Sequence, residues 1–261
     1  MTEVESTWIE VFGWLELEDL LNCRIVCRWW KALGEIDGFY KKFCLELCAR
    51  FEKRGTWFET LKILVGLKRA KKVFDLSGDL VDVLELKELD LNGKCLNELD
   101  ESIGNLRGLQ RLDLRGNQLR RLPDSIGNLS SLQVLNLWSN ELEILPDSFG
   151  NLSNLQVLNL WSNKFKRLPD AFSNLSGLQW LNLRENQLES LPDSFGSLSG
   201  LQWLDLEKNK LESLPDSFGN LSGLQRLDLG SNKLESLPDS FGNLSSLQNL
   251  NLEDNQLERL P

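Results

Sequence analysis

Hydrophobic residues recur along the chain in two different patterns. From Leu86 onward leucines return with a period of 23 residues, in units that begin at Leu86, Leu109, Leu132, Leu155, Leu178, Leu201, Leu224 and Leu247. Residues 86–261 therefore hold seven full units and a partial eighth. Before Leu86 the apolar residues follow helical spacing instead, for example Val26, Trp30 and Leu33. The pattern predicts a helical module followed by a repeat architecture.

Within each unit, the apolar residues predict one short strand. The unit 132–154 reads LQVLNLWSNELEILPDSFGNLSN, with leucine at positions 1, 4, 6, 11 and 14. Leucines 4 and 6 alternate with positions 3, 5 and 7, so a strand turns its leucines inward and the other three outward. One unit cannot close a core, whereas stacked units bury each other's leucines and align their strands about 4.8 Å apart. The expected fold class is α/β, a curved solenoid with a parallel sheet on its concave face.

The other fixed positions of the unit predict turns. Position 9 is asparagine, whose amide offers two donors and an acceptor to the backbone of neighbouring turns. These residues are Asn117, Asn140, Asn163, Asn186, Asn209, Asn232 and Asn255. Proline at position 15 and Gly-Asn at 19 and 20 allow only a short helical turn on the outer side. The first unit departs, with Lys94 at the asparagine position and Asp100 at the proline position.

These units resemble the intracellular LPxxIGNL class of leucine-rich repeats, as in plant Ras-group-related proteins and their animal relatives. The resemblance covers about two thirds of the chain. It implies a solenoid that binds another protein and is not an enzyme.

Positions that differ between units are where a specific function is expected. Position 5 is a polar stripe of Asp90, Asp113, Asn136, Asn159, Asn182, Asp205, Asp228 and Asn251. Position 3 places Val134, Val157, Trp180 and Trp203 between Arg111 and Arg226, and position 7 places Trp138 and Trp161 between Arg115 and Arg184. We predict that these ten residues of positions 3 and 7 bind a partner protein, because exposed apolar patches with Trp and Arg are typical of interfaces.

An alternative for these tryptophans is purely structural. They can stack on one another and on Arg115 and Arg184 as cation–π contacts. If they bind a partner, its apolar anchor meets the tryptophans, its acidic groups favour the arginines, and its basic groups favour the aspartates.

Residues 8–54 predict three helices, at 8–15, 18–33 and 37–50. The strings IEVFGWLELEDL (9–20), VCRWWKAL (26–33) and FYKKF (39–43) resemble an F-box. That resemblance implies docking on the Skp-family adaptor of a cullin-RING ubiquitin ligase, with the repeat domain recruiting the substrate. The motif's apolar positions, and hence the predicted adaptor-binding residues, are Ile9, Val11, Phe12, Leu15, Leu20, Val26, Cys27 and Trp30. The family's leading Leu-Pro is replaced here by MTEVEST.

The expected domains are an F-box-like helical module (1–54), a linker helix with the N-terminal cap of the solenoid (55–85), and the repeat domain (86–261). Within the linker, residues 56–72 predict an amphipathic helix and residues 73–76 a short extra strand.

Charge and hydropathy exclude several partners. Residues 1–80 carry 13 Lys+Arg and 13 Asp+Glu, and residues 81–261 carry 16 against 26, so the net charge of -10 lies in the repeats. An acidic solenoid repels phosphate backbones, which argues against nucleic acid. No apolar run approaches the roughly 20 residues of a membrane span. The acidic N-terminus lacks the features of a secretory signal, so we expect a cytoplasmic protein, with the nucleus left open.

Candidate catalytic and metal chemistry is sparse. The chain has no histidine, which removes the usual general base and the commonest zinc ligand. Cys23 with Cys27 and Cys44 with Cys48 could hold zinc, but the spacing is not that of a zinc knuckle, and we predict reduced thiols without metal or cofactor.

Two functions remain open. The first is a substrate receptor of an SCF-type ubiquitin ligase. The second is a signalling scaffold, for example one that binds a small GTPase, in which the helical module is only a cap. Binding of the adaptor separates them.

Overall fold

The computed structural model describes residues 69–76 and 80–259. The chain divides into two compact units, residues 1–68 and 69–261. The three predicted N-terminal helices and the eight predicted adaptor-binding residues belong to the first unit and lie outside the described residues. Within the described part, no helix is long and apolar enough to cross a membrane.

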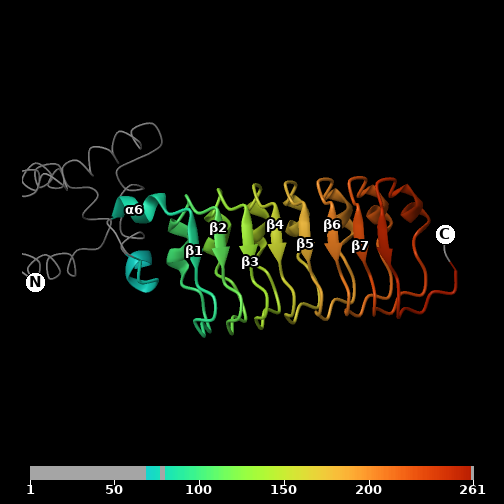
Figure 1. Ribbon diagram of the computed structural model, residues 1–261, viewed down its shortest axis with the longest axis horizontal. Helices are drawn as coiled ribbons and strands as arrows, with labels where there is room; N and C mark the ends of the chain where they lie inside the picture. Colours follow the sequence, from blue (N-terminus) through green and yellow to red (C-terminus); the bar gives the residue numbers. More distant parts are fainter. Residues whose placement is uncertain (1–68, 77–79, 260–261) are drawn as a thin grey trace, which may run out of the picture. The chain divides into compact units, whose positions relative to one another are not determined.

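The repeats build one parallel sheet that is curved and does not close. Its strands follow chain order and pair in register, so that the same position of neighbouring units lies side by side (Figure 1). They are β1 (Glu88–Asp90), β2 (Arg111–Asp113), β3 (Val134–Asn136), β4 (Val157–Asn159), β5 (Trp180–Asn182), β6 (Trp203–Asp205), β7 (Arg226–Asp228) and β8 (Asn249–Asn251). The predicted solenoid, with one short strand from each unit, is confirmed.

A short 3-10 helix forms the outer side of each full unit, as the proline and Gly-Asn positions predict. These helices are η1 (Glu101–Asn105), η2 (Asp124–Asn128), η3 (Asp147–Asn151), η4 (Asp170–Asn174), η5 (Asp193–Ser197), η6 (Asp216–Asn220) and η7 (Asp239–Asn243). Proline, in an extended conformation, precedes η2 to η7. Before η1 the carboxylate of Asp100 instead accepts a hydrogen bond from the backbone N–H of Ser102, so the atypical first unit gains a side-chain cap.

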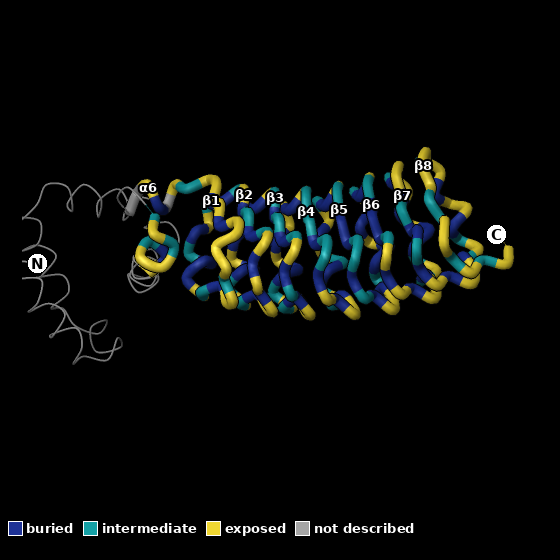
Figure 2. Tube along the Cα trace, turned by 60° about the horizontal axis from the view of Figure 1, so that its bottom comes forward, coloured by how far each residue is buried: buried dark blue, intermediate teal, exposed yellow. Residues whose placement is uncertain are grey.

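The core lies between the sheet and the outer turns (Figure 2). Leu135 and Leu137, at positions 4 and 6, are fully buried, and the same holds for most leucines of these positions. Position 18 adds a column of stacked rings with centroids 6.1 to 6.4 Å apart, made of Phe149, Phe172, Phe195, Phe218 and Phe241. Each buried leucine contributes about 2 kcal/mol, and neighbouring units supply the burial that one unit alone lacks.

The position-9 asparagines join each unit to the one before it. The Oδ1 atom of Asn163 accepts the backbone N–H of Leu142 at 3.0 Å, and its Nδ2 donates to the carbonyls of Leu137 at 3.0 Å and Leu160 at 3.1 Å. Leu137 and Leu142 belong to the preceding unit. The same bonds recur at Asn117, Asn140, Asn186, Asn209 and Asn232, which confirms the structural role predicted for this position.

The segment before the first repeat differs from the prediction of a strand at residues 73–76. Residues 69–73 are helical, and the backbone N–H of Phe74 still bonds the Ala70 carbonyl at 2.9 Å. The chain then turns at Asp75, which has a φ of 49°, and a further helix α6 (Leu80–Glu85) precedes β1. The strand prediction was wrong because a segment of four residues is too short for its pattern to distinguish a strand from a helix end. Arg69 bonds the Asp100 carboxylate at 2.6 Å and so ties this segment to the first repeat.

Candidate protein-interaction surface

The alternation within each strand turns positions 3 and 5 to the open face of the sheet. In β3, Leu135 is buried, whereas Val134 and Asn136 are half-buried. Because the strands pair in register, Val134, Val157, Trp180 and Trp203 form one continuous row across β3 to β6. The ten residues of the predicted patch all belong to positions 3 and 7 of consecutive units.

The four tryptophans of this face form two stacked pairs. The ring centroids of Trp138 and Trp161 are 4.8 Å apart with the planes at 6°, and those of Trp180 and Trp203 are 4.4 Å apart with the planes at 5°. Each pair is worth about 1 kcal/mol beyond its burial. The stacking that we considered as the structural alternative is therefore present. All four rings remain half-buried, so they keep apolar surface on the open face.

The arginines that flank the apolar rows are mostly paired within the chain. Arg111 lies 3.5 Å from Glu88, and Arg115 lies 3.4 Å from Asp113. Arg184 bonds the Glu207 carboxylate directly. Arg226 is exposed and forms no ion pair with any residue that the structure describes. The face thus offers less free positive charge than its four arginines suggest.

The polar stripe at position 5 has a role of its own. Its side-chain oxygen accepts the backbone N–H of position 7, as Asn159 does from Trp161 at 3.1 Å and Asp205 does from Glu207 at 2.9 Å. Asparagine and aspartate make this bond equally well. The fold therefore requires an oxygen at position 5 and does not require a negative charge.

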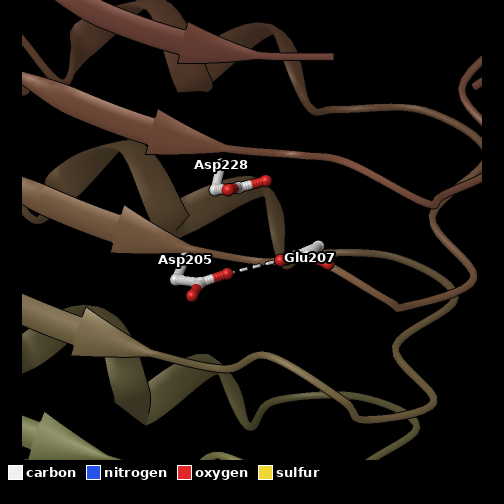
Figure 3. Close-up of side chains that lie close together, drawn as sticks. All are labelled: Asp205, Glu207 and Asp228. Atoms are coloured by element: carbon white, nitrogen blue, oxygen red, sulfur yellow. Dashed lines mark hydrogen bonds between the residues drawn. The ribbon is translucent and has the colours of Figure 1, made fainter. Parts of the chain in front are cut away.

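Three carboxylates gather where the stripe becomes acidic in two adjacent strands (Figure 3). Asp205 ends β6 and Asp228 ends β7, side by side in register, and Glu207 follows β6. One oxygen of each lies within 4.8 Å of the others. Oδ1 of Asp228 accepts bonds from the Gly230 N–H at 2.9 Å and from Nδ2 of Asn251 at 3.1 Å. This cluster was missed from the sequence, although Glu207 and Gly230 replace the tryptophans and arginines of the four preceding units at position 7.

Burial raises the pKa of Asp205 to about 6, and the neighbouring Asp228 charge adds to this effect. The charge of Arg184 acts in the opposite direction, and that of Glu185 raises the pKa further. Asp205 is only 7% exposed, so water does little to stabilise its ionised form. Within the cluster Glu207 is paired with Arg184, whereas Asp205 and Asp228 form no ion pair with a described residue.

Comparison with known proteins assigns the repeats. The family described as leucine-rich repeat region matches residues 56–168 and 169–259. The chain belongs to the leucine-rich-repeat family. A second family, described as F-box-like, matches residues 5–46, which include all eight predicted adaptor-binding residues. Both families consist of protein-interaction modules, and together they support a protein-binding role for this chain.

Solved structures agree with this leucine-rich-repeat assignment. A leucine-rich-repeat protein of Leptospira interrogans is 38% identical over 73% of this chain and 47% of its own, with a TM-score of 0.68. The plant peptide hormone receptor RGFR1, solved in complex with RGF2, is 31% identical over 68% of this chain and 32% of its own, with a TM-score of 0.60. The chain spans less than half of either relative. No curated protein gave a match.

Proposed function

We propose that this chain is the substrate receptor of a cullin-RING ubiquitin ligase of the SCF type. Residues 5–46 dock on a Skp-family adaptor, and the concave face of the repeats binds the target protein. The observation that carries the proposal is the presence in one chain of an F-box-like match and a repeat sheet with half-buried tryptophans on its open face. The chain itself makes and breaks no covalent bond in this role, and it works in the cytoplasm with the ligase.

The geometry of the repeats supports the target-binding half. The position-9 asparagines bond the backbone at position 7, and in-register strand pairing fixes position 3, so the face is preorganised and a partner does not have to order it. Aromatic residues next to arginines are the composition of binding hot spots. The RGFR1 complex is one in which a repeat protein of this kind holds another molecule, RGF2.

Capture of a purified Skp-family adaptor by the full chain tests the proposal. We expect wild-type protein to retain the adaptor and Trp30→Ala to weaken retention at least tenfold, because aromatic hot spots typically contribute about 2 kcal/mol or more. Trp29→Ala is the matched control, since Trp29 is adjacent but does not match an apolar position of the motif. Circular dichroism and thermal unfolding establish that each variant is folded.

Failure of folded wild-type protein to bind the adaptor would contradict the proposal. The helical module would then act as a cap, and the scaffold role would become the better hypothesis. If both tryptophan variants lost binding equally, the loss would indicate damage to the helical module and not removal of one contact. A third variant, Val11→Ala, then distinguishes damage from loss of a contact at another position of the motif.

A further inference from the structure

The charged groups around the Trp180–Trp203 pair do not all have partners among the described residues. Glu185 bonds Nζ of Lys208 at 3.0 Å, and Glu207 is held by Arg184. Asp205 and Asp228 have no such partner: Oδ2 of each accepts no hydrogen bond from any described residue.

This absence of a partner is unusual for the position of Asp205. The residue is 7% exposed and lies against a second carboxylate, and its free oxygen is not among the fully buried atoms, so a bound group can still reach it. A buried carboxylate normally has a cation or several donors beside it. The two oxygens together therefore form an acceptor site that a bound group with paired donors and a positive charge would complete.

We propose that Trp203, Asp205 and Asp228 bind an arginine side chain of the partner protein. The inference rests on the proposed role of the concave face and names the chemistry that this face selects. The arginine's guanidinium stacks on the Trp203 ring and donates to the free oxygens of the two aspartates.

The spacing along the strand fits this ligand. Trp203 and Asp205 are two residues apart on the same face of β6, which separates their Cα atoms by about 6.6 Å. A planar guanidinium reaches both an aromatic face and a carboxylate across such a distance, and its fork of N–H donors suits two adjacent acceptors. The Trp180 ring, stacked behind Trp203 at 4.4 Å, holds the platform in place.

Arg226 lies next to Trp203 on the side opposite Trp180. It pairs in register with Trp203 and stands two residues before Asp228, yet it forms no ion pair with a described residue. Its charge lies at the edge of the site and opposes a second cation there. Replacing it with glutamine is therefore expected to strengthen binding of a cationic ligand two- to fivefold.

The experiment uses the full chain labelled with 15N and follows the indole N–H signals by NMR, assigned with Trp→Phe variants. The probe is the peptide acetyl-Leu-Arg-Leu-amide, and its matched control carries citrulline, which has the shape of arginine without the charge. We expect the arginine peptide to shift the Trp180 and Trp203 signals saturably, with the citrulline peptide binding at least tenfold more weakly. The signals of Trp138 and Trp161 should not move.

Two double variants test whether the arginine peptide binds at Asp205 and Asp228. Asp205→Asn with Asp228→Asn should weaken binding of the arginine peptide at least tenfold. Asp90→Asn with Asp113→Asn, at the other end of the stripe, should leave it unchanged. Asparagine occupies the same position in four other units, so both variants are expected to fold.

Three results would overturn the inference. Equal binding of the citrulline peptide would show that only apolar contact is involved. Broadening of the Trp203 signal by micromolar MnCl2, lost in Asp205→Asn with Asp228→Asn, would make the cluster a divalent-cation site. If the signals of folded protein did not shift at all, the proposed arginine site would be ruled out. The ligase-receptor proposal would not be affected, because adaptor capture tests it separately.

Discussion

The concave face carries a pair of neighbouring aspartates near each of its ends, in different surroundings. Asp90 and Asp113 lie side by side on β1 and β2, as Asp205 and Asp228 do on β6 and β7. At the first end Arg115 follows Asp113 at position 7, and the two charges are 3.4 Å apart. At the second end position 7 is Glu207 or Gly230, and Asp205 is buried.

This difference shows that position 7, more than position 5, decides the electrostatic character of the face. Both aspartates of the comparison make the same structural bond, since Oδ1 of Asp113 accepts the Arg115 N–H at 3.0 Å and Oδ1 of Asp205 accepts the Glu207 N–H at 2.9 Å. In the first pair, Asp113 forms an ion pair with the basic side chain of Arg115. The second keeps its charge available for a ligand, at a cost in stability.

The largest expected effect concerns the position-9 asparagines, which support the sheet at both ends. Asn117→Ala and Asn209→Ala should each lower the free energy of unfolding by about 2 to 4 kcal/mol, because each removes several buried hydrogen bonds and leaves backbone groups unsatisfied. Urea denaturation measures this loss. Asn255→Ala, where the side chain is only partly buried, should cost less. A large difference between Asn117 and Asn209 would mean that the two ends differ in framework as well as in charge.

The next effect separates the two aspartate pairs. Asp205→Asn should stabilise the protein by about 1 to 3 kcal/mol at pH 7, because it removes a buried charge while keeping the bond to the Glu207 N–H. Asp113→Asn should destabilise by less than about 1 kcal/mol, since it removes an ion pair that solvent already screens. Thermal unfolding of both variants at pH 7 tests whether the two changes in stability have opposite signs. Equal signs would contradict the difference between the two aspartate pairs.

The same argument predicts a pH dependence. The pKa of Asp205 is about 6 in the folded protein and 3.8 in its unperturbed state, so the folded state binds the proton more tightly. The contribution of Asp205 to stability should therefore fall as pH rises from about 4 to about 6, and stay level above that. Burial and the charges of Asp228, Arg184 and Glu185 set this range, and Glu207 lies beside the group. The difference in unfolding midpoint between wild type and Asp205→Asn, measured from pH 4 to 8, should show this fall.

The smallest effect comes from giving the second end the basic residue that the first end has. Gly230→Arg places a cation beside Asp228, as Arg115 stands beside Asp113, and should be more stable than Gly230→Ala by about 0.5 kcal/mol at pH 7. A Cβ at this position lies 2.8 Å from Nδ2 of Asn251 and 3.2 Å from Oδ1 of Asp228, so the hydrogen bond between these two side chains has to shift. Gly230→Ala measures this steric part alone. A stability of Gly230→Arg no higher than that of Gly230→Ala would argue that the cluster does not need a cation.

Much of the fold could be predicted from the sequence, because each 23-residue unit repeats the same apolar positions and the same turn residues. The leucines of positions 4 and 6, the outer turns and the bonding of the position-9 asparagines were predictable from period-two alternation and turn chemistry. The presence of Trp138, Trp161, Trp180 and Trp203 on one face followed in the same way, since only the phase of the strand is needed to assign a face.

The stacked structure alone decided which side chains meet across units. Arg184 pairs with Glu207, and Asp205 meets Asp228, because residues 23 apart become neighbours in an in-register stack, and which rotamers they adopt depends on both units. The burial of Asp205, and hence its raised pKa, likewise depends on what its neighbours leave open to water. Local sequence fixes the direction of a side chain, whereas its charge partners and its solvation are properties of the assembled surface.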